Sequence, residues 1–307
     1  MYDLIIIGGG PAGLTAGIYA QRARLRTLLL EKEIIGGQIA VSDIIENYPG
    51  FPSISGAGLM EKFEQHARGL GLEIKLTDVI DIQDTGKTKI VKTSEGDLTA
   101  MSVIVATGAK PKRLGIPGEK EWTGKGVSYC ATCDGPFFRN QRVLVVGGGD
   151  TAVKEAVYLS KIAGKVYLAH RRDQLRAEKI IQEKALAAPN IEMLWSHVLK
   201  EIKGKIAVEK IVLQSLKDNT IKELDAEGVF IFVGINPTTD FVDVEKDGQG
   251  FIKADENMQT SAQGIFAAGD CRTTPLKQVS TAVGDGAIAA FMAEKYIEEL
   301  SYTESNK

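Results

Sequence analysis

The chain of 307 residues is long enough for two domains, and its 44% hydrophobic and 25% charged residues exclude a disordered chain and a small disulfide-stapled scaffold. Its 37 basic and 40 acidic residues give a net charge of −3, so no excess of cations predicts binding to nucleic acid. The longest apolar run, 229–235, contains Gly234 and is too short to cross a membrane. Asp3 and the absence of basic residues before Arg22 argue against a signal peptide, and three cysteines, an odd number, favour a reducing, cytoplasmic compartment.

Two segments of the chain repeat one pattern. Residues 4–13, LIIIGGGPAG, and residues 143–152, VLVVGGGDTA, are each a short apolar run followed by a glycine cluster. Such a run predicts a buried parallel strand that turns into a helix. After each copy we expect a helix, a second strand, an antiparallel excursion and a final apolar strand. Two nucleotide-binding domains are therefore predicted.

The expected strands follow in chain order. They are 26–32, 73–84, 87–93 and 101–108 in the first copy, and 165–171, 191–202, 210–214 and 228–234 in the second. A further apolar strand, 264–270, and a helix beginning near Gly286 are expected to complete the first domain. Proline and glycine residues interrupt the apolar pattern at 110–118 and 236–244, which indicates two crossovers between the domains.

The predicted fold class is α/β. It has two Rossmann-like domains of the three-layer ββα type, with the second domain inserted in the first. We expect residues 1–113 and 244–307 to form the first nucleotide-binding domain, and residues 114–243 to form the second, which carries a C-x-x-C motif.

Both repeats contain the fingerprint of a dinucleotide-binding loop. Its glycines are Gly8, Gly10 and Gly13 in the first copy and Gly147 and Gly149 in the second. Between a strand and a helix, such glycines let the backbone approach a pyrophosphate at the helix N-terminus. A tight glycine turn without a ligand is the alternative, and two matches in the same context favour the dinucleotide.

The residue that ends the next strand distinguishes the two ligands. Glu31 and His170 each stand 23 positions after the first glycine of their fingerprint (31 − 8 and 170 − 147). Glu31 is suited to accept hydrogen bonds from ribose hydroxyls and would repel a phosphate. His170, Arg171, Arg172 and Arg176 offer cations suited to the 2′-phosphate of NADPH, and a solvated surface cluster is the alternative.

Cys130 and Cys133 form a C-x-x-C motif, which can be a redox pair, half of a zinc site, or incidental. Zinc requires four ligands, and the sequence offers no second C-x-x-C and no spaced histidine pair, so we expect no metal. Two neighbouring thiols suit reversible disulfide chemistry, in which one thiolate attacks and the other resolves. Asp134 could exchange a proton with a thiol, or it could close an Asx turn onto Gly135.

These motifs, together with four shorter ones, resemble the bacterial low-molecular-weight thioredoxin reductases. The shorter motifs are GGQ at 36–38, ENYPG at 46–50, ATG at 106–108 and AAGD at 267–270. The resemblance spans nearly the whole chain. It implies a homodimeric enzyme that passes electrons from NADPH through FAD to the Cys130–Cys133 disulfide and then to thioredoxin.

The resemblance also implies roles for single residues. Cys133 would face the flavin, Cys130 would attack the protein substrate, and Asp134 would be the acid. FAD would be bound by Gly8, Gly10, Gly13, Glu31, Gly37, Gln38, Asn47, Asp270 and Gln278. NADPH would be bound by Gly147, Gly149, Asp150, Thr151, His170, Arg171, Arg172 and Arg176. Lys277 stands where the family often has arginine and receives no role, while Cys271 is expected to be a small buried filler.

Other readings of the same residues stay open. The scaffold could take electrons from another donor, such as ferredoxin or a reduced flavin, or serve another thioredoxin-like partner. A non-catalytic flavin or nucleotide sensor would use the C-x-x-C as a switch. A reductase of the peroxiredoxin system is disfavoured, because that subfamily usually has an additional N-terminal thioredoxin-like region.

One geometric consequence follows from the expected domains. The C-x-x-C and the NADPH fingerprint share the inserted domain, so the nicotinamide and the disulfide must take turns at the flavin. We therefore expect two domain orientations, with hinges near Gly115 and Thr239. Trp122 and Trp195 are expected to be packing residues, and His66 is expected to lie on a solvated helix face.

Overall fold

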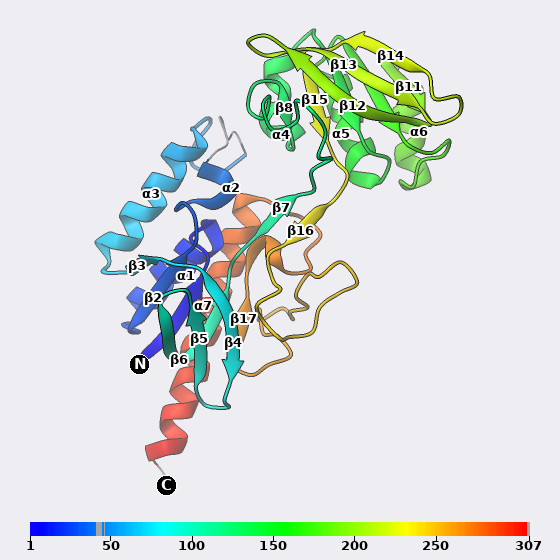
Figure 1. Cartoon of the computed structure of the whole chain (residues 1–307). Coiled ribbons are helices and arrows are strands. Elements are labelled where there is room, and N and C mark those ends of the chain that lie inside the picture. Colours follow the sequence, from blue (N-terminus) through cyan, green and yellow to red (C-terminus); the bar gives the residue numbers. More distant parts are fainter. Residues whose placement is uncertain (41–44, 46, 306–307) are drawn as a thin grey trace. The chain divides into compact units, whose positions relative to one another are not determined.

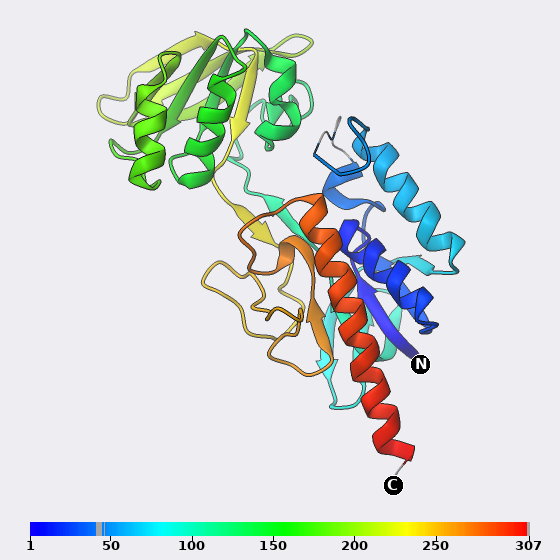
Figure 2. The same cartoon turned by 180° about the vertical axis from the view of Figure 1, so that it is seen from behind.

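The computed structural model describes residues 1–40, 45 and 47–305 (Figures 1 and 2). The chain divides into two compact units. One consists of Met1–Lys110 with Asn236–Lys307, and the other of Pro111–Ile235. Among the described residues, no helix is both long and apolar enough to cross a bilayer.

The first unit is built on a seven-stranded sheet whose order is β3-β2-β1-β6-β5-β4, with β17 also paired to β6. The strands β3, β2, β1, β6 and β17 are parallel, and β4 and β5 form an antiparallel excursion from β6. The strands are β1 (Tyr2–Ile7), β2 (Thr27–Glu31), β3 (Glu73–Leu76), β4 (Val79–Asp84), β5 (Lys89–Thr93), β6 (Gly96–Val105) and β17 (Ile265–Ala267).

Apolar side chains on both faces of this sheet make two cores. Leu4 and Ile6 face a core that includes residues of α1 (Pro11–Arg22) and α7 (Val279–Ser305), whereas Ile5 and Ile7 face the opposite core. Figure 2 shows α7 running beside α1. The two helices touch closely, because a Cβ added at Gly286 of α7 would lie 2.2 Å from the carbonyl oxygen of Ala12. The remaining helical segments are α2 (Gly37–Ala40), α3 (Gly56–Gly69) and the 3₁₀ helix η2 (Gly269–Cys271).

The second unit has three layers. A parallel sheet of order β11-β10-β9-β15-β8 lies between helices and an antiparallel sheet, β12-β13-β14, with one apolar core on each side (Figure 1). Its strands are β8 (Val127–Ser128), β9 (Arg142–Val146), β10 (Lys165–His170), β11 (Ile191–Trp195), β12 (His197–Gly204), β13 (Val208–Ser215), β14 (Ile221–Asp225) and β15 (Gly228–Ile231). Its helices are α4 (Ala131–Asp134), η1 (Gly135–Phe138), α5 (Asp150–Ser160) and α6 (Lys179–Ala187). The predicted α/β fold class is confirmed.

The two crossovers pair with each other as a short ribbon of β7 (Ala109–Pro111) and β16 (Ile235–Pro237). The two positions expected to be hinges are each hydrogen-bonded inside their own unit. The Gly115 amide donates to the buried carboxylate of Glu119 at 2.7 Å, and the Thr239 hydroxyl donates to the Gly250 carbonyl at 2.7 Å. The expectation of two orientations stays a prediction.

Three expected elements differ in the structure. The strand expected over 73–84 is two strands, because β3 pairs with β2 whereas β4 pairs with β5. The strand expected over 191–202 is likewise divided at Ser196, where a positive φ of 56° turns the chain from one sheet into the other. The last helix begins at Val279 and not near Gly286; that glycine lies inside the helix, where the close contact with α1 leaves no room for a side chain.

Candidate functional site

The loop between β1 and α1 is a cradle that needs its glycines for different reasons. Gly8 has a φ of 112°, and an added Cβ there would lie 2.3 Å from the Ala106 carbonyl oxygen. A Cβ at Gly13 would lie 1.8 Å from the Gly8 oxygen. At Gly10, which precedes α1, an added Cβ would meet nothing within 4 Å. The first two glycines therefore permit close packing of the backbone, and Gly10 leaves open space at a helix N-terminus, where an anion is stabilised.

Glu31 holds this loop from the end of β2. Its Oε2 accepts a hydrogen bond from the Gly9 amide at 2.7 Å, and its Oε1 accepts one from the Glu33 amide at 2.8 Å. Each carboxylate oxygen retains acceptor capacity for a further donor, such as a ribose hydroxyl.

Residues far apart in sequence meet near the same loop. Gly37 of α2 lies against Gly10, since a Cβ added at Gly37 would be 3.8 Å from the Gly10 Cα. The Asn47 side-chain amide donates to Oε1 of Gln278 at 2.9 Å. A pocket of about 500 Å³ is lined by residues 47–52. Gln38 is exposed on α2, and Glu46 of the ENYPG motif lies outside the described residues.

Asp270 lies in η2 with a half-buried carboxyl group. Burial raises its pKa, the positive charge of Lys277 opposes this change, and the Asp285 carboxylate reinforces it. In the part of the chain that the structure describes, the Asp270 carboxylate has no hydrogen-bond donor. It is a half-buried acceptor that a ligand hydroxyl would satisfy.

Two neighbouring interactions fix this turn, and sequence reasoning missed both. The Lys277 ammonium donates to the carbonyl oxygens of Asp270 and Arg272 at 3.0 and 3.2 Å. Arg272 makes a two-pronged ion pair with Asp285 at 2.7 and 2.8 Å, and the Gly269 amide donates to the same carboxylate at 3.0 Å. The unusual lysine at position 277 could have drawn attention to its contact with this turn. No local sequence pattern could have predicted the pairing of Arg272 with Asp285.

The loop between β9 and α5 repeats the cradle in the second unit. Gly147 has a φ of 152°, and an added Cβ there would lie 2.5 Å from the Phe232 carbonyl oxygen. A Cβ at Gly149 would meet nothing within 4 Å, as at the equivalent glycine of the first unit. Asp150 begins α5, and its Oδ1 accepts a hydrogen bond from the Glu178 amide at 2.7 Å, while Thr151 is exposed in the first turn.

His170 packs directly on this second loop. A Cβ added at Gly148 would lie 2.2 Å from its Nδ1, so the imidazole fills the space beside that glycine. Its Nε2 is buried and has no hydrogen-bond partner in the described part of the chain. Burial lowers the His170 pKa, and the charges of the neighbouring arginines lower it further, so both favour the neutral ring.

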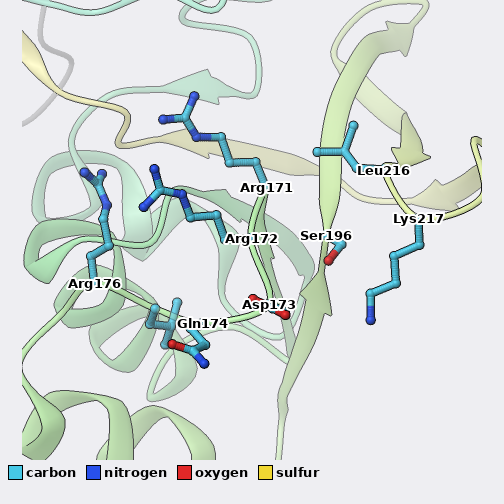
Figure 3. Close-up of a pocket in the computed structure, with 9 residues that line it drawn as sticks. Arg171, Arg172, Asp173, Gln174, Arg176, Ser196, Leu216 and Lys217 are labelled. Carbon is cyan, nitrogen blue, oxygen red and sulfur yellow. The ribbon is translucent and has the colours of Figure 1, made fainter.

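A cationic pocket of about 520 Å³ follows β10 (Figure 3). Figure 3 shows the guanidinium groups of Arg171, Arg172 and Arg176 gathered on one side. The Arg176 amide also donates to the Gly148 carbonyl at 2.7 Å, which ties the pocket to the glycine loop. The whole lining consists of Arg171, Arg172, Asp173, Gln174, Leu175, Arg176, Ser196, Leu216 and Lys217. Ser196 lies at the turn between β11 and β12, Leu216 and Lys217 directly follow β13, and no local motif marks these three residues.

Cys130 and Cys133 form a disulfide at α4. The Cys133 amide donates to Sγ of Cys130 at 3.2 Å, and the Cys130 amide donates to the Ser128 hydroxyl at 3.0 Å. Both cysteines are half-buried. Asp134 ends α4, its amide donates to the Cys130 carbonyl at 3.1 Å, and its side chain does not cap the following η1.

The third cysteine is fully buried. The Cys271 thiol donates to the carbonyls of Val105 and Ala268, each at 3.3 Å, and burial raises its pKa to about 11. Such a thiol packs as a small side chain and does not react as a nucleophile. Trp122 and Trp195 pack against the second unit's cores, and His66 is exposed. The described residues contain no group of three or more His, Cys, Asp or Glu side chains arranged to hold a metal ion.

Two dinucleotide-binding loops on separate parallel sheets, together with a C-x-x-C disulfide, define a disulfide oxidoreductase with two nucleotide-binding domains. A family model described as pyridine nucleotide-disulphide oxidoreductase matches residues 2–286, and the chain belongs to this family. Membership implies that the enzyme works with a flavin and a pyridine nucleotide.

Individual relatives agree with this assignment. The chain is 48% identical to a thioredoxin reductase from Peptoclostridium litorale, over 98% of both chains. It is 44% identical to a thioredoxin reductase from Bacillus subtilis (strain 168), over 99% of this chain and 97% of the relative. The crystal structure of thioredoxin reductase from Streptococcus pyogenes MGAS5005 matches with a TM-score of 0.89 and 46% identity, over 97% of this chain and 99% of that one. The predicted resemblance, fold class and enzyme class are confirmed.

Proposed function

We propose that the protein is a cytoplasmic thioredoxin-disulfide reductase that takes electrons from NADPH through FAD to the Cys130–Cys133 disulfide and passes them to thioredoxin. The observation that carries the proposal is the combination of one disulfide with two open glycine cradles. One cradle is followed by the carboxylate Glu31, and the other is followed by a pocket of three arginines.

The first cradle fits FAD. The open space at Gly10 leaves room for the pyrophosphate at the N-terminus of α1, and Glu31 is placed to accept from a ribose hydroxyl. The Asp270 carboxylate would accept from the ribityl hydroxyls, and the linked Asn47 and Gln278 would lie along the isoalloxazine. The residues proposed to hold FAD are Gly8, Gly10, Gly13, Glu31, Gly37, Gln38, Asn47, Asp270 and Gln278. When bound, FAD would supply the two-electron redox chemistry that links NADPH to the Cys130–Cys133 disulfide.

The second cradle fits NADPH. Its open position, Gly149, precedes α5, whose first residues Asp150 and Thr151 would line the pyrophosphate. Guanidinium groups bind a phosphate through several charge-assisted hydrogen bonds. NADH has no 2′-phosphate and therefore could not form these bonds. The residues proposed to hold NADPH are Gly147, Gly149, Asp150, Thr151, His170, Arg171, Arg172 and Arg176. This pocket favours NADPH over the alternative donors.

The thiols then perform disulfide exchange. Once reduced, Cys130 attacks one sulfur of the thioredoxin disulfide, which forms a mixed disulfide and releases the other thioredoxin sulfur as a thiolate. Cys133 attacks Cys130 in turn, which reforms the Cys130–Cys133 disulfide and releases dithiol thioredoxin. Asp134, next to Cys133, is proposed to deliver the protons that the departing thiolates take up.

An anaerobic titration tests the proposal. The purified protein should be yellow, NADPH should bleach the flavin absorbance, and NADH should do so only at much higher concentration. Cys133→Ser should abolish reduction of thioredoxin disulfide while flavin reduction by NADPH continues. A variant that still turned over thioredoxin would disprove the assigned roles of the two thiols.

Turnover also separates the enzyme from a redox-switched sensor. The sensor would be reduced once per protein molecule and would not cycle with thioredoxin. We also propose the homodimer that the resemblance implies; light scattering of the purified protein tests it, and a single-chain mass would contradict it.

A further inference from the structure

Lys277 lies immediately before Gln278 and the start of α7, beside Asp270 of η2. Its surroundings in the structure are specific and give it a role.

The Lys277 ammonium is held by three contacts. It donates to the carbonyl oxygens of Asp270 and Arg272 at 3.0 and 3.2 Å, and it lies 4.2 Å from the centroid of the Phe251 ring. The Phe251 ring is 5% exposed, so this cation–π contact is shielded from solvent on the ring side. The ammonium therefore fixes the main chain on both sides of Cys271.

The charge of Lys277 acts on the Asp270 carboxylate. Burial disfavours the ionised form of this group, Asp285 disfavours it further, and Lys277 is the cation that favours it. Arg272, the other cation of this turn, is engaged in its two-pronged ion pair with Asp285. Lys277 thus opposes, without reversing, the effect of burial on the Asp270 pKa.

We propose that Lys277 is a positioning residue for the flavin, which fixes the η2 main chain through the Asp270 and Arg272 carbonyls and so holds Asp270 in place as an acceptor for the ribityl hydroxyls. The inference rests on the proposed function, because it requires FAD beside Asp270. Lys277 itself need not touch the cofactor. Arginine would supply the same charge and could donate to the same two carbonyls.

The experiment measures FAD affinity on the full-length, flavin-containing protein. Serial dilution releases FAD, and the recovery of flavin fluorescence gives the dissociation constant. Lys277→Met, which keeps the length of the side chain but removes its charge, should weaken FAD binding on the order of tenfold, the effect of losing a charged hydrogen bond. Lys277→Arg should restore an affinity close to that of the original protein.

A matched control is available on α7. The exposed ammonium of Lys295 lies 4.6 Å from the centroid of the Phe291 ring but donates to no backbone carbonyl at a cofactor site. Lys295→Met therefore removes a cation–π contact like that of Lys277 and should leave FAD affinity unchanged. Thermal unfolding of the flavin-free chains, with Lys277→Gln as a second variant, shows whether the fold is preserved.

A double-mutant cycle with Asp270→Asn shows whether Lys277 acts through Asp270. If it does, Lys277→Met should cause little further loss in the Asp270→Asn background. Equal losses in both backgrounds, an unchanged affinity of Lys277→Met, or failure of Lys277→Arg to restore binding would each overturn the inference. A parent protein that takes up no FAD would instead overturn the proposed function on which it rests.

Discussion

The side chains of Asn47 and Gln278 are joined by a hydrogen bond of 2.9 Å although they stand 231 positions apart. This bond links the loop 47–52 to the start of α7, beside the Asp270 turn. It joins two amide groups that the family resemblance implies to lie along one flavin.

The first prediction concerns this pair. Asn47→Ala and Gln278→Ala should each weaken FAD binding several-fold, because each leaves the other amide without its partner. The double variant should lose less FAD affinity than the product of the two single losses, since both substitutions remove the same hydrogen bond. Fluorescence of released FAD is the measurement, and independent effects would contradict a shared role.

The second prediction separates the glycines of the first cradle. Gly13→Ala should destabilise the flavin-free chain by about 3 kcal/mol, because the new methyl group would collide with the Gly8 carbonyl oxygen. Gly10→Ala should leave that stability nearly unchanged and weaken FAD binding, because its methyl group would enter the space reserved for the pyrophosphate. Thermal unfolding and FAD titration of both variants check this. Similar stability losses in the two variants would contradict the assignment.

The third prediction concerns the arginine pocket. Arg171→Ala, Arg172→Ala and Arg176→Ala should each raise the KM for NADPH roughly tenfold or more and change the KM for NADH little, because NADH has no 2′-phosphate. Arg139→Ala, an exposed arginine of the same unit outside the pocket, is the control. Equal effects on both nucleotides would show that the pocket does not bind the phosphate.

The fourth prediction is a pH dependence of stability. The folded-state pKa of His170 is lowered, so as pH falls below the ordinary pKa of about 6.5 the unfolded chain takes up a proton that the folded chain resists. Its contribution is therefore present at higher pH and is lost on acidification. The free energy of unfolding, measured by denaturant between pH 7.5 and about pH 5, should fall less steeply in His170→Gln than in the original protein. His66→Gln, at an exposed histidine, should keep the original slope.

The fifth prediction concerns the third cysteine. A buried thiol whose pKa is raised to about 11 should resist alkylation at pH 8 in the folded, oxidised protein. Reduction should expose two further reactive thiols, Cys130 and Cys133, which mass spectrometry after alkylation would identify. Cys271→Ala should retain thioredoxin reduction, and loss of turnover in a stably folded variant would show that this thiol takes part in the reaction.

The sequence by itself determined the parts of this protein that depend on neighbouring residues. The strand–glycine–helix repeats, the C-x-x-C pair and the residues after each second strand are local patterns, because a phosphate-binding turn and a disulfide of two close cysteines are built within a few positions. These patterns predicted the α/β class, and their resemblance to a known family implied the enzyme class.

Only the tertiary structure decided what depends on distant pairing. The split of 73–84 between β3 and β4 follows from the different strands that each half meets, and that choice is not encoded in the apolar pattern of the segment. Three further features likewise require the folded chain. They are the ion pair of Arg272 with Asp285, the hydrogen bond from Lys277 to the Asp270 carbonyl, and the position of Lys217 in the lining of the arginine pocket. Spacing in sequence determines the partners of a side chain only within one helical turn or one strand. The charges that shift the pKa of a buried carboxylate can come from any part of the chain that the fold brings close to it.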